Sequence, residues 1–252
     1  MQLRALGTTG INVSILGLGT VKLGRNEKVR YPEPFEIPDD AGARELLALA
    51  KSLGINLLDT APAYGTSESR LGTLLAGQRH DWVICTKVGE LFSDGASSYD
   101  FTPEHVQHSV KVSLQRIHTD YLDVVLIHSD GRDLSILESY GTLEALRDLK
   151  SRGWIRAVGI SHKSVVGAER AIDLGCDVIM ATLNLAAQEE SDVIAKAGEA
   201  GCGVLIKKAF GSGHATIDSL SYAAGHAGVS AVVVGTINPE HLRDNAAALA
   251  AE

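Results

Sequence analysis

No apolar run in this sequence is long enough to cross a bilayer. The longest mostly aliphatic stretches, such as Val229 to Val234, have the length of a strand, whereas a membrane helix needs roughly 20 apolar residues. The N-terminal residues also lack the long apolar segment of a secretory signal. These absences predict a cytoplasmic protein that has no membrane partner.

Cysteine is scarce, and the histidines form no metal motif. The three cysteines, Cys85, Cys176 and Cys202, occupy strand-like or strand-entry positions without metal-ligand spacing, which indicates buried, reduced thiols. His105, His108 and His118 lie around one expected helix, and no paired histidine motif with a carboxylate accompanies them. We therefore expect no metal site.

Positive charge is in the minority. The chain has 23 Lys and Arg residues against 31 Asp and Glu residues, which gives a formal net charge of −8. A negative surface offers nucleic acid or an anionic membrane little to bind, so neither is expected as a partner. Any anion must be bound by a local cluster of groups. Nothing in the sequence specifies an oligomeric state.

Strand patterns and helix patterns alternate along most of the chain. From the strand near Leu16 to the helix that begins at Pro239, eight units in succession have a short aliphatic strand followed by a helix. The strands are nearly continuous aliphatic runs, as expected for a parallel sheet that is covered on both faces. Eight such units in 252 residues predict an α/β fold, a closed (β/α)8 TIM barrel, rather than an open doubly wound sheet. We expect one domain over residues 1–252.

Several segments have clear local signals. Two short strands around Gly7 to Gly10 are expected to form an N-terminal hairpin, and Thr102-Pro103-Glu104 marks a strong helix start. The prolines of the segment from Val21 to Pro38, namely Pro32, Pro34 and Pro38, predict a long loop. We also expect a loop over residues 89–101 and one helix over residues 134–150.

Four chemically active side chains lie at or just past the ends of successive strands. Asp59 ends one strand and Tyr64 follows five residues later, while Lys87 and His128 end the next two strands. In a parallel barrel the carboxyl ends of all strands meet at one rim, so these residues are expected to converge. The alternative to a functional site is that Asp59 is simply solvated and that Tyr64 simply packs against its neighbours.

The four groups suit proton donation to a carbonyl. A phenol with an ordinary pKa of about 10 donates poorly at neutral pH unless its anion is stabilised. The ammonium of Lys87, held by Asp59, is expected to lower the pKa of Tyr64, and His128 could orient the polarised oxygen of the substrate. None of these groups transfers electrons, which points to a cofactor that supplies a hydride.

The Asp-Thr-Ala-Pro-Ala-Tyr-Gly of residues 59–65, with Lys87 and His128, resembles the signature of the aldo-keto reductase family. The resemblance implies that Tyr64 is the general acid, that Lys87 and Asp59 tune it, and that His128 positions a small-molecule carbonyl substrate. It also implies reduction of aldehydes or ketones by NAD(P)H, and an N-terminal β-hairpin that closes the barrel floor. Family members bind the dinucleotide without a Rossmann fold, and no Gly-x-Gly-x-x-Gly opens a helix here.

The same resemblance implies a set of cofactor-binding residues. They are Gly19, Thr20, Asp59, Ser161, His162, Lys207, Gly235, Thr236, Asn238, His241 and Asn245. Ser161 matches a serine that binds the carboxamide, whereas His162 stands where the family usually has Asn. The segment from Gly235 places the end of a strand before a helix N-terminus, which favours an anion.

Some positions depart from the family. Met180 and Leu183 stand where a glutamine and a stacking aromatic residue are common, so cofactor binding could be weakened by about 0.5 to 1.5 kcal/mol. Members selective for the 2′-phosphate often have Lys at the position of Gly235 and Arg at that of His241. Because Arg243 lies nearby, we expect NADPH as the cofactor and keep NADH open.

Two other functions remain open at this point. A Schiff-base aldolase or lyase could use Lys87 or Lys207 in the same barrel. The chain could also be a non-catalytic nicotinamide-binding subunit, although a binder has little need for the acid, amine, phenol and imidazole together.

Overall fold

The computed structural model describes residues 1–29, 31, 33–211, 213 and 215–250. Eight parallel strands close into a barrel, which confirms the expected (β/α)8 fold. In chain order they are β3 (Leu16–Gly19), β4 (Leu57–Asp59), β5 (Val83–Val88), β8 (Leu122–His128), β9 (Ile155–Ser161), β10 (Val178–Thr182), β11 (Gly203–Lys207) and β12 (Ala231–Val234). The sheet closes where β12 pairs with β3, for example Val233 with Gly17.

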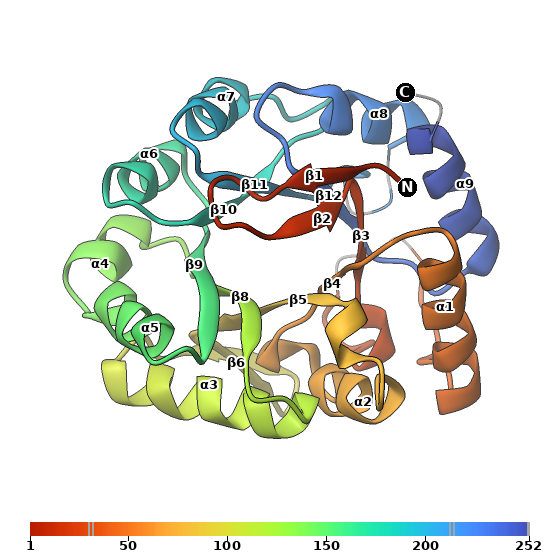
Figure 1. Cartoon of the computed structure of the whole chain (residues 1–252), viewed down its shortest axis with the longest axis horizontal. Helices are drawn as coiled ribbons and strands as arrows, with labels where there is room; N and C mark the ends of the chain where they lie inside the picture. The colour runs from red at the N-terminus through yellow and green to blue at the C-terminus, as the bar shows by residue number, and fades with distance from the viewer. Residues whose placement is uncertain (30, 32, 212, 214, 251–252) are drawn as a thin grey trace.

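Helices surround the barrel (Figure 1). They are α1 (Asp40–Ser52), α2 (Ser67–Leu74), α3 (Pro103–Ile117), α4 (Asp133–Glu138), α5 (Thr142–Ser151), α6 (Val165–Asp173), α7 (Ser191–Glu199), α8 (Ile217–Gly225) and α9 (Pro239–Ala250). The predicted start at Thr102 is confirmed, because its hydroxyl accepts a hydrogen bond from the amide of His105. None of the helices in the described part of the chain is both long enough and apolar enough to cross a membrane.

The single helix expected over residues 134–150 is wrong. The structure has α4 and α5 there, and α5 is preceded by Gly141, whose φ of 74° is left-handed. A residue in that conformation cannot continue a right-handed helix, so the chain turns and starts a second one.

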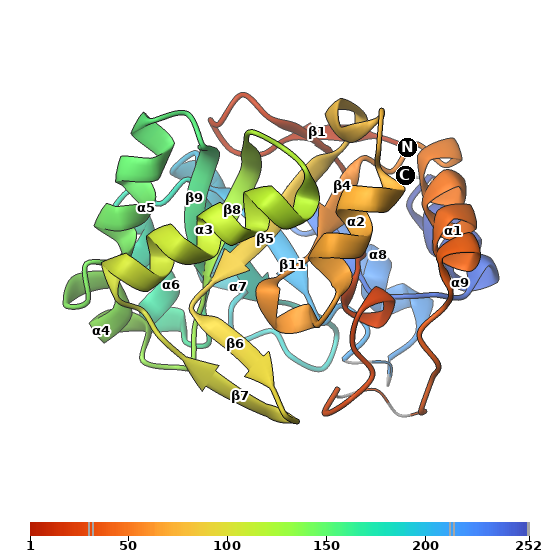
Figure 2. The ribbon, with the colours of Figure 1, turned by 90° about the horizontal axis from the view of Figure 1, so that it is seen from below.

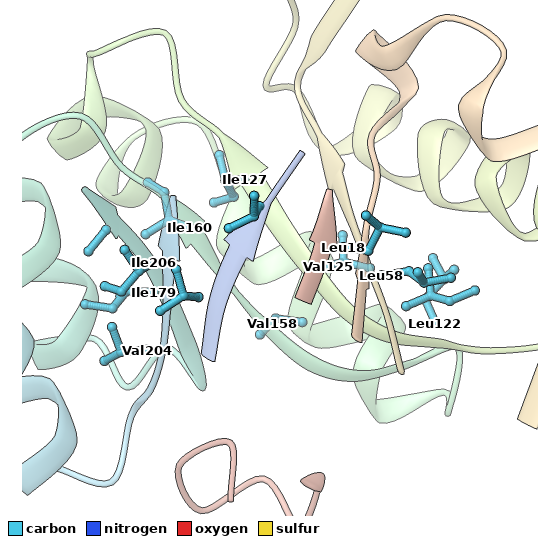
Figure 3. Close-up of a cluster of buried hydrophobic side chains, with 14 of the residues drawn as sticks. Leu18, Leu58, Leu122, Val125, Ile127, Val158, Ile160, Ile179, Val204 and Ile206 are labelled. Atoms are coloured by element: carbon cyan, nitrogen blue, oxygen red, sulfur yellow. The ribbon is translucent and has the colours of Figure 1, made fainter. Parts of the chain in front are cut away.

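The hydrophobic core has two layers separated by the barrel wall. Outward-facing aliphatic side chains of the strands pack against the helices (Figure 3), and Leu18, Val125 and Ile160 are examples with no exposed surface. Inward-facing side chains such as Leu57 and Leu205 form a smaller cluster inside the barrel. The near-continuous aliphatic runs thus reflect strands buried on both faces.

The N-terminal hairpin lies across one end of the barrel (Figure 1). It consists of β1 (Leu3–Ala5) and β2 (Asn12–Ser14), as expected. Leu6, Ile11 and Val13 of this hairpin are buried and belong to the cluster inside the barrel. The hairpin therefore closes the barrel floor with apolar side chains.

The loop expected over residues 89–101 is wrong, because these residues contain a second hairpin, which lies at the opposite end of the molecule (Figure 2). It consists of β6 (Glu90–Ser93) and β7 (Ala96–Tyr99), which form a separate two-stranded sheet. Asp94 and Gly95 form the two-residue turn, both with positive φ. Asp-Gly is a preferred sequence for such a turn, so this signal was present and overlooked.

The described residues of the segment from Val21 to Pro38 have the irregular structure expected, apart from one short 3-10 helix, η1 (Val21–Leu23). Residues 30 and 32, the latter one of the prolines on which that prediction depended, lie outside the described residues. Two other 3-10 helices, η2 (Pro62–Tyr64) and η3 (Arg79–Asp81), follow β4 and precede β5.

Candidate active site

The carboxyl end of each barrel strand contributes one inward-facing residue to a common cavity of about 1190 Å³. Side chains alternate along a strand, so the residue two positions beyond Leu57 also faces inward, and that residue is Asp59. In the same way, Lys87 lies two positions beyond inward-facing Cys85, and His128 lies two positions beyond inward-facing Leu126. The eight residues are Gly19, Asp59, Lys87, His128, Ser161, Thr182, Lys207 and Gly235, and all line the cavity.

Asp59, Lys87 and Tyr64 are in direct contact. The Lys87 ammonium donates hydrogen bonds to Oδ1 of Asp59 at 2.6 Å, to the Tyr64 hydroxyl at 3.2 Å and to the carbonyl of Thr60 at 2.9 Å. The Tyr64 hydroxyl also donates to Oδ2 of Asp59 at 3.5 Å. Tyr64 comes from η2, and the centroid of its ring lies 4.8 Å from the Lys87 ammonium.

His128 lies beside Tyr64. The two ring centroids are 6.3 Å apart and the ring planes are nearly perpendicular. Nδ1 of His128 is 2.8 Å from Oε2 of Glu90, a residue of the second hairpin that the sequence reading did not single out. The structure thus brings Asp59, Tyr64, Lys87 and His128 together at one mouth of the barrel.

Burial dominates the acidity of the phenol. It raises the pKa of Tyr64 well above the ordinary value, Lys87 acts in the opposite direction, and Asp59 adds to the increase. The expected net lowering of this pKa is therefore wrong for this structure, although Lys87 has the expected direction of effect. Burial alone would lower the pKa of Lys87, but Asp59 and Tyr64 favour the ammonium and the pKa is raised overall. At neutral pH the site contains a neutral phenol beside a fixed cation.

The sequence from residue 15 to 218 matches the model of the Aldo/keto reductase family. The chain belongs to the aldo-keto reductase family. Aldo-keto reductases are oxidoreductases that generally use NAD(P)H, and the closed barrel agrees with the architecture of solved members.

Solved structures and a curated relative are similar to this chain. A protein from Pseudomonas aeruginosa assigned to the aldo-keto reductases is 50% identical, with a TM-score of 0.91 over 99% of this chain and 94% of that one. The holo form of aldo-keto reductase AKR11C1 from Bacillus halodurans is 26% identical, with a TM-score of 0.85 over 99% and 91% of the two chains.

The uncharacterized oxidoreductase YqkF from Bacillus subtilis is 36% identical over 165 residues, which are 64% of this chain and 49% of the relative. The chain spans about half the length of the curated relatives it matches.

Most of the residues that we expected to bind a cofactor line the same cavity. Those that do are Gly19, Asp59, Ser161, His162, Lys207, Gly235, Thr236, His241 and Asn245. Thr20 does not: it is buried, and its hydroxyl donates to the carbonyl of Asp59 at 2.9 Å. Asn238 is not a lining residue either, because its side chain accepts a hydrogen bond from the amide of Glu240 in the first turn of α9.

His162 and Lys207 form a buried polar group with Glu190. Nε2 of His162 is 2.8 Å from Oε2 of Glu190, and the Lys207 ammonium donates to Ser161 Oγ at 2.9 Å and to the His162 carbonyl at 2.6 Å. Burial and Lys207 lower the pKa of His162 to about 3, so its ring is neutral. Burial lowers the pKa of Lys207 to about 7. The His162 side chain is thus directed at Glu190.

The lining also shows where sequence reasoning was incomplete. Leu183 is fully buried in the outer core and does not line the cavity, whereas Met180 does. Tyr31, from the loop after β3, lines the cavity on the side of Gly235, and a Cβ atom at Gly235 would be 2.6 Å from its hydroxyl. The ammonium of Lys22 lies 3.9 Å from the centroid of the Tyr31 ring. The loop prediction was a signal for a binding segment, but it did not identify Tyr31.

Metal-ligating groups are not clustered in the described residues. Among them, no set of three or more His, Cys, Asp and Glu side chains is placed to hold a metal ion. The three cysteines are buried and free.

Proposed function

We propose that this protein reduces aldehydes or ketones to alcohols with NADPH, and that NADH is the alternative cofactor. The observation that carries the proposal is the contact of the Tyr64 hydroxyl with the Lys87 ammonium at 3.2 Å, in a cavity that His128 also lines. Tyr64 is the general acid, Lys87 and Asp59 tune it, and His128 orients the carbonyl. Three buried free cysteines are consistent with a cytoplasmic location.

The lining residues suit a dinucleotide. Lys207 offers a hydrogen-bond donor beside Ser161, and Gly19 and Gly235 add no side chain to the rim. The N-terminus of α9 follows β12 closely and favours an anion. When bound, the reduced nicotinamide supplies the hydride.

Side chains of the protein itself donate the proton that the carbonyl oxygen receives. As the carbonyl carbon gains a hydride, negative charge develops on its oxygen, and the Tyr64 proton moves to that oxygen. The phenolate that remains is stabilised by the Lys87 ammonium, whose position Asp59 holds. Before the reaction, the raised pKa of Tyr64 keeps the proton on the phenol.

A binding titration with NADPH and NADH, followed by a panel of aldehydes and ketones, tests the proposal. We expect Tyr64→Phe to lose roughly 10² to 10⁴ in turnover, the range for general acid catalysis, and to keep dinucleotide binding. Tyr140→Phe is the matched control, because Tyr140 is exposed and its hydroxyl accepts a hydrogen bond from Arg132, away from the cavity lining. Full turnover by Tyr64→Phe would remove the proton-donor assignment.

Lys207 favours a second candidate, a Schiff-base aldolase or lyase. Burial lowers its pKa to about 7, so a large fraction of its amine is uncharged and nucleophilic at neutral pH. Lys87 lacks this property, because its ion pair with Asp59 keeps it charged. Trapping of a carbonyl substrate on Lys207 by borohydride would favour the lyase. Tight dinucleotide binding without turnover of any carbonyl would instead favour a non-catalytic binding subunit.

A further inference from the structure

Glu90 brings a carboxylate to the buried side of His128. Its Oε2 lies 2.8 Å from Nδ1 of His128, and the two side chains are 12% and 21% exposed. Ser97 on β7 donates a hydrogen bond to Oε1 of Glu90 at 2.7 Å. The guanidinium of Arg25 lies 3.4 Å from the ring centroid of Phe92 on the same hairpin. The carboxylate is therefore held by its own hairpin, and Arg25 from the loop after β3 packs against that hairpin.

This contact determines which ring nitrogen carries the proton. Nδ1 of His128 is buried. Within the described part of the chain no acceptor is well aligned with it, but the Glu90 carboxylate lies close to it, at 2.8 Å. With Nδ1 unprotonated, two electronegative atoms with no proton between them would lie 2.8 Å apart, which is repulsive. The proton is therefore on Nδ1. Because His128 lines the cavity, Nε2 is the nitrogen left for a ligand.

We propose that Glu90 is a positioning residue that holds the proton of His128 on Nδ1 and so reserves Nε2 for the substrate oxygen. The identity of that oxygen rests on the proposed function, whereas the place of the proton is a property of the free protein. With Nδ1 protonated, Nε2 accepts a hydrogen bond while the ring is neutral and donates one when the ring is an imidazolium. His128 thus polarises a carbonyl only in its charged form, which Glu90 stabilises.

The charges around His128 act in opposite directions, and its pKa is lowered overall. Burial lowers the pKa of His128, and Lys87 on β5 and Lys207 on β11 lower it further, whereas Glu90 raises it. Burial also raises the pKa of Glu90, but the contacts with His128, Ser97 and Arg25 outweigh burial and lower it to about 2. The other titratable groups facing the pair are Tyr64 on η2 and Tyr99 on β7. Removing the charge of Glu90 should therefore lower the pKa of His128.

The place of the proton can be measured without cofactor or substrate. In protein labelled with 15N-histidine, the nitrogen shifts of His128 report which nitrogen is protonated and at which pH the ring titrates. The His128→Gln variant lacks the nitrogen signals of His128, so comparison with the wild type assigns them. We expect neutral His128 to have its proton on Nδ1, Glu90→Gln to lower its pKa by about one unit, and Glu90→Ala to move a measurable fraction of the proton to Nε2.

Asp94→Asn is the matched control. Asp94 is exposed at the turn of the same hairpin, and asparagine tolerates its φ of 52°. This variant removes one negative charge from the hairpin, and we expect it to leave the titration of His128 unchanged. The proposal is overturned if wild-type His128 lacks a proton on Nδ1, or if Glu90→Gln and Asp94→Asn titrate alike.

Steady-state kinetics add a readout that depends on the reaction. In carbonyl reduction, kcat should fall as pH rises through the pKa of His128, because the ionised ring is lost. Glu90→Gln should therefore move this alkaline limb of the kcat profile toward lower pH by about one unit. An unshifted limb in an active enzyme overturns the link to substrate. The expected nitrogen shifts in a protein without turnover would support the proton placement and reject the reductase.

Discussion

Lys87 and Lys51 form ion pairs of equal length in very different surroundings. Lys87 lies 2.6 Å from Asp59, with the two side chains 2% and 6% exposed. Lys51 lies 2.6 Å from Asp81, with 47% and 35% exposed. Without Lys87, the carboxylate of Asp59 would be buried with no cation at its side. We expect Lys87→Met to lower the free energy of unfolding by about 3 to 5 kcal/mol, and Lys51→Met to lower it by about 0 to 1 kcal/mol.

Urea unfolding of both variants at pH 7 measures these two losses. Equal losses would show that burial does not govern the strength of the pair, and would weaken the account of Tyr64 that depends on a fixed Lys87. In the proposed reductase, Lys87→Met should also lose turnover, while Lys51→Met should keep it, because Lys51 lies on the outer side of α1.

The positions of Asp59, Lys87 and His128 could be predicted because each ends an aliphatic run, and parallel strands carry such residues to one rim. The raised pKa of Tyr64 could not be predicted from the sequence. The free-energy cost of burying its anion depends on how completely the folded chain excludes water. Glu90 and Tyr31 were missed for a related reason. Their places depend on the paths of a hairpin and a loop, and no strand period determines those paths.

Segments with local chemistry of their own were the most predictable elements. Thr102 begins a helix because its side chain accepts a hydrogen bond from a first-turn amide, and a short sequence motif reveals this start. The break between α4 and α5 was harder to predict. Buried Leu137 and Leu143 both face the core, so apolar spacing alone does not separate the two helices.

The second hairpin depends on its turn. Gly95 has a φ of 74°, a conformation that costs residues with a Cβ atom about 1 to 2 kcal/mol. Since β6 and β7 form a separate two-stranded sheet, Gly95→Val should open this hairpin and leave the barrel intact. We expect amide hydrogens between Glu90 and Tyr99 to exchange about 5 to 30 times faster, measured by mass spectrometry.

Ala96→Val provides the comparison for this experiment. Ala96 is the next residue along, is exposed and lies in β7, where a β-branched side chain is favourable. The amide hydrogens of the hairpin in the Ala96→Val variant should exchange at the wild-type rate or more slowly. Equal acceleration in the two variants would mean that the turn conformation does not hold the hairpin together.

At the scale of the whole molecule, eight repeated units were enough to predict closure of the barrel, because the barrel strands are nearly continuous aliphatic runs and helices separate them along the chain. The shape of the cavity was not predictable in the same way. It is formed largely by the segments beyond the strands, including the loop of Tyr31 and the residues after β11, whose paths depend on contacts distant in the chain.

The barrel floor allows a test of how far the two ends of the molecule are independent. Leu6 is fully buried and packs against Gly203 of β11, whereas Leu3 of the same hairpin is 57% exposed. Leu6→Ala removes buried methyl groups and leaves a cavity, so it should cost about 2 to 5 kcal/mol of unfolding free energy. Leu3→Ala should change it by less than about 0.5 kcal/mol.

Both leucine variants leave the rim untouched, and the site lies at the other end of the strands. Below the unfolding transition, dinucleotide affinity and turnover in the Leu6→Ala variant should therefore stay within about twofold of wild type, a difference of less than about 0.5 kcal/mol. Urea unfolding and a nicotinamide titration on the same preparation measure the two properties together. A large loss of binding in the folded variant would mean that floor packing sets the geometry of the rim. Equal stability losses at the two leucines would instead mean that the hairpin does not fill the barrel.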